Sequence, residues 1–257
     1  MKSKTYGVSF DNISKDFFSN KTQIRAIELV DLKITTGEFV CIVGPSGCGK
    51  STLIKIGAGL LNPTSGDVRY LGEKINGPVS EVGIVFQNAA LLDWRKTLPN
   101  VMLPIEMRGL DYSVYQPRAK ELLRSVGLED FMDRYPYELS GGMQQRTAIC
   151  RALIHDPPVL LMDEPFGALD ALTREQLSRE LIKIWETKKQ TVIFVTHSIP
   201  EAVFLGDRVV VMTPRPGNVA KIFDIKLPRP RDVSVERTSA FTDYVDSIRT
   251  ILGPIAI

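Results

Sequence analysis

The chain has 257 residues, of which 44% are hydrophobic and 24% are charged, so it can bury a substantial core and is not disordered over most of its length. Its net charge of +2 argues against a dedicated nucleic-acid-binding protein, which usually carries a clustered basic surface. No stretch approaches the roughly 20 apolar residues that cross a bilayer, so a role at a membrane would require docking to another protein.

The cysteines and histidines narrow the chemistry further. The sparse, odd set Cys41, Cys48 and Cys150 indicates reduced thiols in a cytosolic protein. Only two histidines, His155 and His197, are present, which argues against a histidine-rich metal site, and we expect His155 to be structural. The first twelve residues, MKSKTYGVSFDN, lack the apolar segment of a secretory signal.

Strands dominate the prediction for the first 90 residues. Phe39–Val43 is continuously apolar, as expected for a strand buried on both faces. A glycine-rich turn follows it, then a helix over Lys50–Leu60 and a turn at Asn62–Gly66. The other strands that we expect here are Tyr6–Phe10, Ile24–Ile34, Val68–Leu71 and Val82–Phe86.

Helix-forming residues replace the strands from about residue 88 to residue 154. We expect a helical subdomain inserted there. Its predicted helices are Leu98–Arg108, Pro117–Val126, Glu129–Arg134 and a segment from Gly142 to about Ile154.

Strands and helices alternate again after residue 155, which predicts a parallel α/β sheet with right-handed crossovers. A tail rich in Pro and Arg starts at Pro214, and a last helix is expected over Ala240–Leu252. The elements predicted between them are strand Val159–Met162, helix Ala171–Lys188, strand Thr191–Val195, helix Pro200–Leu205 and strand Arg208–Met212.

The strongest local signal is the segment GPSGCGKST, which fits the pattern G-x-x-x-x-G-K-[ST] between a buried strand and a helix. Its glycines allow the backbone to wrap around phosphates, and the helix N-terminus attracts anionic oxygens. Lys50 is expected on the β- and γ-phosphates, the Ser51 hydroxyl on Mg²⁺ and the Thr52 hydroxyl on the α-phosphate. The predicted ATP-binding residues of this loop are Gly44, Pro45, Ser46, Gly47, Cys48, Gly49, Lys50, Ser51 and Thr52.

Two carboxylates end the apolar strand that begins at Val159. They lie at the C-terminal edge of the sheet, where α/β proteins form ligand sites. We expect Asp163 to hold Mg²⁺ and Glu164 to polarise the attacking water, because phosphoryl transfer needs in-line positioning and charge neutralisation.

A second candidate anion site is the segment Leu139–Arg146, LSGGMQQR, which opens a helix. It combines the Ser140 hydroxyl, the flexible backbone of Gly141 and Gly142, and a helix N-terminus. One cleft does not need two phosphate cradles, so we infer that a second subunit supplies this one.

With these motifs in order, the chain resembles the ABC (ATP-binding cassette) ATPases, whose signature is LSGG, from about residue 7 to at least residue 230. The resemblance implies an α/β P-loop NTPase fold with a mostly parallel core sheet, an N-terminal antiparallel β-subdomain and an inserted α-helical subdomain. It also divides the single domain 1–257 into a core with the β-subdomain (1–87 and 155–230), a helical subdomain (88–154) and a C-terminal tail (231–257).

The resemblance assigns further roles. Gln87 matches the glutamine that contacts Mg²⁺ and senses the permease, and Asp170 matches the residue that communicates across the dimer. His197 matches the switch histidine on the γ-phosphate, and Phe17 matches the aromatic residue that stacks on adenine, with Phe18 as the competing choice.

Two positions depart from the family pattern. Met143 stands where many members have Gln, and Ser198 follows the switch histidine where Asp is usual. These departures put in question some contacts across the dimer and the local support of the switch, but they remove no residue that is expected to perform chemistry.

The implied protein is a homodimeric ATPase that binds ATP and Mg²⁺ and works at the cytoplasmic face of the inner membrane. It would drive a separate permease, gripped through the segment 88–109, and would act indirectly with a solute-binding protein. Leu91, Leu92 and Trp94 are exposed candidates for this contact; the alternative is that they belong to the core. The segments LLDWRKTLPNVMLPIEMRG and GDRVVVMTPRPG resemble importers of nitrate, sulfonates, taurine or small heterocyclic solutes.

Two alternative functions remain to be weighed, a non-transport ABC ATPase and an exporter ATPase. Only 89 residues separate Lys50 from Leu139, which is too few for the long coiled coil of DNA-repair members. Translation members usually carry two cassettes in one chain, whereas this chain has one. Nothing in the sequence itself excludes export.

Overall fold

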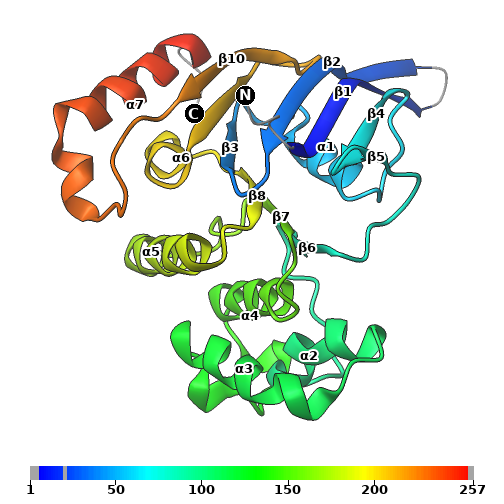
Figure 1. Ribbon diagram of the computed structural model, residues 1–257, viewed down its shortest axis with the longest axis vertical. Helices are drawn as coiled ribbons and strands as arrows, with labels where there is room; N and C mark the ends of the chain where they lie inside the picture. The colour runs from blue at the N-terminus through cyan, green and yellow to red at the C-terminus, as the bar shows by residue number, and fades with distance from the viewer. Residues whose placement is uncertain (1–5, 20–21, 254–257) are drawn as a thin grey trace.

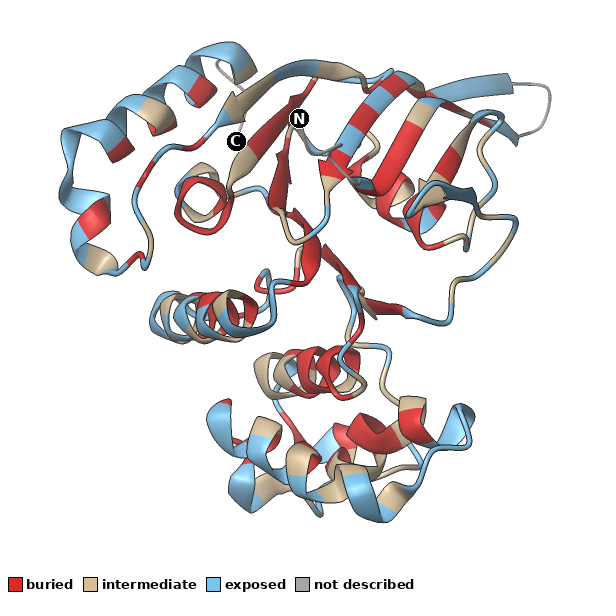
Figure 2. Ribbon diagram, viewed as in Figure 1, coloured by how far each residue is buried: buried red, intermediate tan, exposed pale blue. Residues whose placement is uncertain are grey.

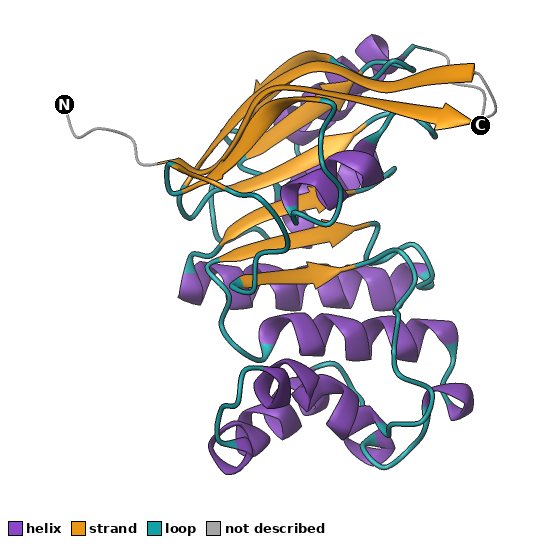
Figure 3. Ribbon diagram, turned by 90° about the vertical axis from the view of Figure 1, so that its right-hand side faces the viewer, coloured by secondary structure: helices purple, strands orange, loops and turns teal. Residues whose placement is uncertain are grey.

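The computed structural model of the protein describes residues 6–19 and 22–253. Two β-sheets, with helices packed on them, form one end of the long axis, and a group of helices forms the other end (Figure 1). Seen from the side, the strands of both sheets lie above these helices (Figure 3).

Six strands form the core sheet in the spatial order β10-β9-β3-β8-β7-β6. Neighbouring strands are parallel, except that β10 runs antiparallel to β9. The predicted mostly parallel core sheet is therefore confirmed, with an antiparallel edge strand that the sequence analysis did not anticipate. The bounds are β3 Phe39–Val43, β6 Val82–Val85, β7 Val159–Asp163, β8 Thr191–Val195, β9 Arg208–Met212 and β10 Val219–Asp224.

The central strands β3, β7 and β8 are buried at every residue (Figure 2). Successive side chains point to opposite faces of the sheet, so Phe39, Cys41 and Val43 join one hydrophobic cluster, whereas Val40 and Ile42 join another. A strand with two apolar faces needs a cover on each side, which explains the unbroken apolar runs in the sequence.

An antiparallel sheet in the order β2-β1-β4-β5 packs over one face of the core sheet, with α1 between them. β1 is much longer than the predicted strand Tyr6–Phe10, because polar residues beyond Phe10 continue the pairing with β2 and hide the strand from an apolar-run search. This extension carries Phe17 onto the strand, opposite Ile24. The bounds are β1 Tyr6–Ser19, β2 Thr22–Thr35, β4 Ser65–Tyr70, β5 Glu73–Lys74 and α1 Lys50–Gly57.

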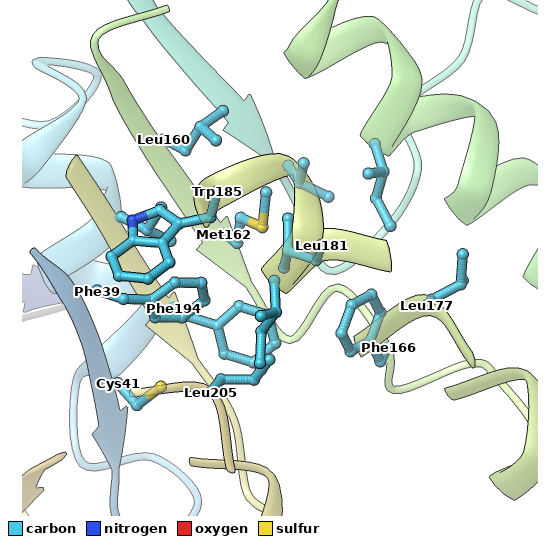
Figure 4. Packing of buried hydrophobic residues seen from close by; sticks show 14 of the residues in the cluster. Phe39, Cys41, Leu160, Met162, Phe166, Leu177, Leu181, Trp185, Phe194 and Leu205 are labelled. Atoms are coloured by element: carbon cyan, nitrogen blue, oxygen red, sulfur yellow. The ribbon is translucent and has the colours of Figure 1, made fainter. Parts of the chain in front are cut away.

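Helices cover the opposite face of the core sheet. Aromatic rings fill the space between them, with Trp185 of α5 edge-on to Phe39 of β3 at 5.8 Å between ring centroids and Phe194 beside them (Figure 4). Such pairs add to the burial of large apolar surfaces. The helices of this face are α5 Ala171–Lys188, α6 Ile199–Leu205 and α7 Ser239–Leu252.

The helical end of the molecule lies between β6 and β7 in the chain. α3 begins five residues before the predicted Pro117, because the Asp111 side chain accepts a hydrogen bond from the Ser113 amide at 2.9 Å and caps the helix. Its elements are α2 Thr97–Met107, α3 Tyr112–Ser125, the 3₁₀ turns Glu129–Phe131 and Pro136–Glu138, and α4 Gly141–Leu153.

The predicted helix Glu129–Arg134 was wrong, since only a 3₁₀ turn forms there. The Met132 carbonyl accepts a hydrogen bond from the Leu98 amide at 3.0 Å, and the Arg134 carbonyl accepts one from the Thr97 amide at 2.8 Å. These two amides belong to the first turn of α2, which has no intrahelical partners for them. The segment therefore caps α2 instead of continuing its own helix.

The tail beyond β10 packs on the core through two arginines. Arg231 is buried and donates hydrogen bonds to the carbonyls of Val203, Phe204 and Gly206 at 3.0, 2.9 and 2.8 Å, which satisfies the last carbonyls of α6. Burial lowers the pKa of Arg231 to about 10. The Arg229 guanidinium lies 4.4 Å from the centre of the Trp185 ring. A 3₁₀ turn, Val233–Arg237, leads from there to α7.

Within residues 6–19 and 22–253, no helix combines the length and the hydropathy needed to cross a membrane. The three cysteines are free and buried.

Candidate functional site

The glycine-rich loop connects the buried strand β3 to α1. Gly49 precedes the helix with φ of 99°, in the left-handed region, and a Cβ atom there would lie 2.8 Å from Cγ1 of Ile27. Only glycine therefore fits this position without displacing its neighbours. Lys50 is 6% exposed, and its Nζ donates to the carbonyls of Gly44 at 2.8 Å and Pro45 at 3.0 Å. The loop thus holds a buried ammonium group at its centre.

Cys48 contributes its backbone to this loop and its side chain to the core. The thiol is fully buried, and burial raises its pKa. A Cβ atom on Gly44 would lie 2.9 Å from Sγ of Cys48, so the loop and the thiol are closely packed. Its Sγ lies 3.8 Å from Nζ of Lys50, but Cys48 itself is not part of the cavity lining described below.

Ser51 and Asp163 meet below the loop. The Ser51 hydroxyl donates to Oδ1 of Asp163 at 2.9 Å, although the residues are 112 positions apart. Asp163 ends β7 and is 4% exposed, and its burial raises the pKa of the carboxyl group, an effect that the Ser51 hydrogen bond partly opposes. The structure therefore brings together two oxygen groups that the sequence analysis assigned to one metal ion.

Glu164 follows in an unusual backbone conformation. Its φ is 46°, in the left-handed region that few residues other than glycine adopt. Its amide donates to the Val195 carbonyl at 2.9 Å, and Oε2 lies 3.5 Å from Nδ1 of His197. The two residues that were predicted to be catalytic are thus neighbours, placed by the ends of two adjacent parallel strands, β7 and β8.

His197 has an exposed side chain and is supported from its C-terminal side. Ser198 takes the position where the family pattern has Asp. Its hydroxyl accepts a hydrogen bond from the Glu201 amide at 3.4 Å and caps α6, and its own amide donates to Oγ1 of Thr196 at 3.0 Å. A serine can therefore fill the capping role at this position.

A cavity of about 530 Å³ collects half of the predicted site residues. Its lining includes Phe17, residues of the glycine-rich loop, Gln87 and Glu164. The predicted residues of the loop that line it are Ser46, Gly47, Gly49, Lys50, Ser51 and Thr52. This volume is within the range of small-molecule sites.

Phe17 and Phe18 are separated by the alternation of β1. Phe17 lines the cavity and is 41% exposed, whereas Phe18 is 74% exposed and is not part of the lining. Successive side chains of a strand point to opposite faces, so only one of the two can face the glycine-rich loop. The structure places Phe17 there.

The signature segment does not line this cavity. Ser140 is exposed and caps α4, where its hydroxyl accepts a hydrogen bond from the Met143 amide at 3.3 Å. Gly141 and Gly142 form the first turn of α4, which lies in the helical end of the molecule (Figure 1). Asp170 is also absent from the lining; it is exposed and caps α5 by accepting from the Thr173 amide at 3.0 Å.

A direct link joins the signature helix to the cavity. Gln145 of α4 is 2% exposed, and its Nε2 donates to the Phe86 carbonyl at 2.9 Å, one residue before Gln87. Arg151, two turns further along α4, donates to the carbonyls of Ala89 and Ala90 at 2.7 and 2.8 Å. The segment that carries Gln87 is therefore fastened to the helix that the signature opens.

Three lining residues were missed from the sequence: Ile24, Ala26 and Arg215. The first two belong to β2 and carry no chemical signal of their own. Arg215 lies in the PRPG segment between β9 and β10, and its position beside the cavity depends on a contact across 168 residues, from its Nε to the Gly47 carbonyl at 3.4 Å.

Comparison with known proteins identifies the family. The family model described as ABC transporter matches residues 27–167, which contain the glycine-rich loop, the signature and both carboxylates. The chain belongs to the ABC transporter family. It is the ATP-binding, ATP-hydrolysing subunit of such a transporter. The predicted family, fold class and ATPase activity are confirmed.

Individual ABC transporter proteins are similar to this ABC ATPase over most of their length. An uncharacterized ABC transporter ATP-binding protein of Methanocaldococcus jannaschii is 49% identical over 94% of this chain and 90% of its own. The taurine import ATP-binding protein TauB of Ruegeria pomeroyi is 47% identical over 86% of this chain and 82% of its own. The aliphatic sulfonates import ATP-binding protein SsuB of Bacillus cereus is 44% identical over 89% of this chain and 90% of its own.

Solved structures of a bacterial ABC transporter cassette, MJ0796, have the same fold. Its dimeric form matches this ABC ATPase with a TM-score of 0.80 and 35% identity, over 86% of this chain and 100% of that one. A second dimeric structure, a post-hydrolysis state bound to ADP and inorganic phosphate, matches with a TM-score of 0.79.

Proposed function

We propose that two copies of this ABC ATPase bind Mg-ATP between them, and that hydrolysis drives import of a taurine-like or sulfonate-like solute through a separate permease. The observation that carries the proposal is the division of the predicted site. Phe17, the glycine-rich loop, Gln87 and Glu164 line one cavity, whereas Ser140 and Gly141 of the signature segment are exposed on another part of the chain. A site split in this way is completed by a second copy.

The cavity suits a nucleotide with its adenine at one end and its phosphates at the other. Phe17 offers a ring face to the base. The loop residues from Gly44 to Thr52 offer backbone N–H groups, the N-terminus of α1 and the Lys50 ammonium to the phosphates. We assign ATP-binding roles to these residues on that basis.

The oxygen groups below the loop fit Mg²⁺. The Ser51 hydroxyl and the Asp163 carboxyl group are 2.9 Å apart, and Mg²⁺ prefers oxygen ligands and is commonly shared with substrate phosphates. Among the residues that the structure describes, no group of three or more His, Cys, Asp or Glu side chains could hold a metal without the nucleotide. Ser51, Asp163 and Gln87 would hold the ion, which would neutralise phosphate charge when bound.

Glu164 and His197 are the residues that we propose act on the reacting phosphate. Glu164 lines the cavity and would orient and polarise the attacking water, while the neighbouring imidazole, 3.5 Å away, would contact the γ-phosphate. Holding these groups at fixed strand ends provides the positioning on which phosphoryl transfer depends.

The second copy would supply Ser140, Gly141, Gly142 and Asp170. The hydroxyl of Ser140 and the N-terminus of the 13-residue helix α4 are exposed and suited to an anion. A side chain on Gly142 would approach Leu169 to 2.9 Å, so the small residue maintains the packing of the signature against the segment before Asp170. The two partner-facing segments are therefore built as one unit.

The permease contact that we propose is the segment 88–109. Trp94 is 74% exposed, whereas Leu91 and Leu92 are half-buried. Asn100 is fully buried and fixes the loop that presents Trp94, because its amide donates to the carbonyls of Leu92, Arg95 and Lys96 and its Oδ1 accepts from the Leu92 amide. An exposed aromatic side chain on a loop that is held by hydrogen bonds suits a protein interface.

The relatives named for taurine and aliphatic sulfonate import support the importer assignment and the solute class. The same assignment implies an extracytoplasmic solute-binding protein that acts indirectly, a peripheral position at the cytoplasmic face of the membrane, and no nucleic-acid partner. Within the chain we propose a core with β-subdomain at 1–87 and 155–230, a helical subdomain at 88–154 and a tail at 231–257.

The hydrolytic roles are tested with Glu164→Gln and Lys50→Ala in the full chain. Loss of general-base assistance costs about 10²–10⁴-fold in rate, so Glu164→Gln should bind ATP, hydrolyse it at least 100-fold more slowly and accumulate as an ATP-bound dimer. Lys50→Ala should weaken ATP binding. Glu121→Gln, the same change at an exposed position of α3, is the matched control. Normal turnover by Glu164→Gln would refute its role.

Direction and solute are tested in vesicles that contain the copurifying permease and binding protein. We expect uptake of labelled taurine or an alkanesulfonate that depends on ATP and disappears with Lys50→Ala. ATP-driven efflux of the same solutes, or no solute movement with an active ATPase, would refute the import assignment.

A further inference from the structure

Arg215 lines the cavity that we assign to ATP, together with Phe17, Ala26 and Gly47. It lies in the loop 213–218, which joins β9 to β10 and carries the sequence TPRPGN. None of the motifs that predicted the ATP site includes this loop. The position nevertheless places a guanidinium group at the edge of the phosphate cradle, where Nε of Arg215 is 3.4 Å from the Gly47 carbonyl.

The loop is fixed in this position by its own backbone. The Gly217 amide donates to the Ala26 carbonyl at 2.9 Å, and the Gly217 carbonyl accepts from the Glu28 amide at 2.9 Å, so the loop adds a short parallel bridge to β2. A Cβ atom on Gly217 would lie 1.8 Å from the Cys48 carbonyl, which shows how closely the loop approaches the phosphate cradle. Arg215 is therefore held beside the cavity by contacts on two sides.

The base of the loop is closed as well. The Thr213 amide donates to the Asn218 carbonyl at 2.9 Å, and the Asn218 amide donates to Oγ1 of Thr213 at 2.9 Å. These bonds join the two ends of the segment and leave its tip, with Arg215, directed toward the cavity that it lines. A loop fixed in this way loses little conformational entropy when it contacts a ligand.

The charge of Arg215 is not neutralised by the protein. Its exposed side chain makes the single hydrogen bond to Gly47, and no carboxylate pairs with it among residues 6–19 and 22–253. A guanidinium group offers five N–H donors in a planar fork that matches phosphate oxygens. The arrangement thus provides donors and positive charge beside Gly47, whereas the Lys50 ammonium is bonded to the carbonyls of Gly44 and Pro45.

We propose that Arg215 is a nucleotide-binding residue whose guanidinium contacts the phosphate chain of ATP and ADP at the edge of the cradle marked by Gly47. Phosphate is the expected partner because the guanidinium lies against the phosphate-binding loop. Charge-assisted hydrogen bonds of this kind are short and strong. The inference rests on the proposed ATP-binding role of the cavity.

The test is titration of Mg-ATP and Mg-ADP into the full chain and three variants of Arg215. Arg215→Ala and Arg215→Gln should weaken binding of both nucleotides about tenfold, as expected for loss of a charged hydrogen bond. Arg215→Lys should lose less nucleotide affinity, because lysine keeps the positive charge. The loss of affinity in the Arg215 variants should become smaller as the salt concentration is raised.

Two controls separate the possible failures. Arg237→Ala removes an exposed arginine far along the chain, in the 3₁₀ turn before α7, and should bind nucleotides as the wild type does. Lys50→Ala tests the cavity itself. If Arg215→Ala and Arg215→Gln bind ATP within twofold of the wild type while Lys50→Ala binds poorly, the proposal for Arg215 is overturned and the ATP site stands. If Lys50→Ala also binds normally, the assignment of the cavity fails first. Thermal melting of all Arg215 variants, expected within a few degrees of the wild type, excludes unfolding as the cause of a loss.

Discussion

The hydrogen bond from Gln145 to the Phe86 carbonyl offers a direct test of how the signature helix is joined to the proposed ATP site. The amide is 2% exposed, and the bond is 2.9 Å long. Gln145→Met keeps the length of the side chain but removes the donor, which leaves the Phe86 carbonyl without this part-buried hydrogen bond. Such a loss costs about 1–3 kcal/mol.

This loss of stability predicts a measurable shift of the unfolding midpoint in urea. With a denaturant slope of about 3 kcal/mol per molar, the unfolding midpoint should fall by roughly 0.3–1 M. Gln145→Glu should lose more stability, because a buried carboxylate would face the Phe86 carbonyl. Gln176→Met is the matched control, since it makes the same change at an exposed position of α5 and should leave the midpoint unchanged.

The functional effect should accompany the structural one. Phe86 precedes Gln87, so loosening this bond should allow Gln87 to move away from the nucleotide and should lower kcat for ATP hydrolysis under conditions where both variants are folded. A midpoint for Gln145→Met within 0.2 M of the wild type, roughly the resolution of the measurement, together with an unchanged kcat would refute the reasoning.

Three other changes test the fold around the site. Gly217→Ala should cost about 3 kcal/mol of stability or prevent folding, because its Cβ would lie 1.8 Å from the Cys48 carbonyl. Gly77→Ala has open space around it and should leave the melting temperature unchanged. Equal melting temperatures of the two variants would contradict the close packing of Gly217 against Cys48. Asn100→Ala should lower the stability measured in urea by about 2–4 kcal/mol, because several hydrogen bonds of a buried amide are lost, and should weaken copurification of the permease. Unchanged stability together with unchanged copurification would show that the loop does not depend on Asn100. Burial lowers the pKa of His155 to about 4 from an ordinary value near 6.5, so the unfolded chain binds an additional proton between these values, and stability should fall as pH drops through this window. Because the side chain is partly exposed, the free energy of unfolding should fall by only about 1 kcal/mol between pH 7 and pH 5. If His155→Gln lost as much stability over this range as the wild type, His155 would be excluded as the cause.

The motifs that the sequence displays as contiguous segments were placed correctly along the chain. A phosphate loop must connect a strand to a helix, and GPSGCGKST does so between β3 and α1. Apolar runs predicted β3, β7 and β8, because strands buried on both faces are apolar at nearly every position; the exceptions are Asp163 at the end of β7 and Thr191 at the start of β8. The local signals were therefore sufficient for the parallel strands of the core sheet and for the family, but not for the edge strand β10.

The sequence pattern was weaker where partners outside a segment decide its structure. Residues beyond Phe10 are too polar to predict a strand, but β2 supplies the hydrogen bonds that extend β1 to Ser19. The segment Glu129–Arg134 has helical composition, yet it ends as a 3₁₀ turn because its carbonyls are taken by the amides of α2. Tertiary hydrogen bonds outweigh local propensity in both cases.

The sequence by itself determined the chemistry of this ABC ATPase, because phosphate, acidic and signature motifs are local and their residue types are dictated by the ligand. Only the tertiary structure decided which groups meet. It chose Phe17 over Phe18 through the alternation of one strand, paired Ser51 with Asp163 across 112 residues, and brought Arg215 to the cradle. These choices depend on strand register and backbone contacts between distant segments, which no short sequence pattern encodes.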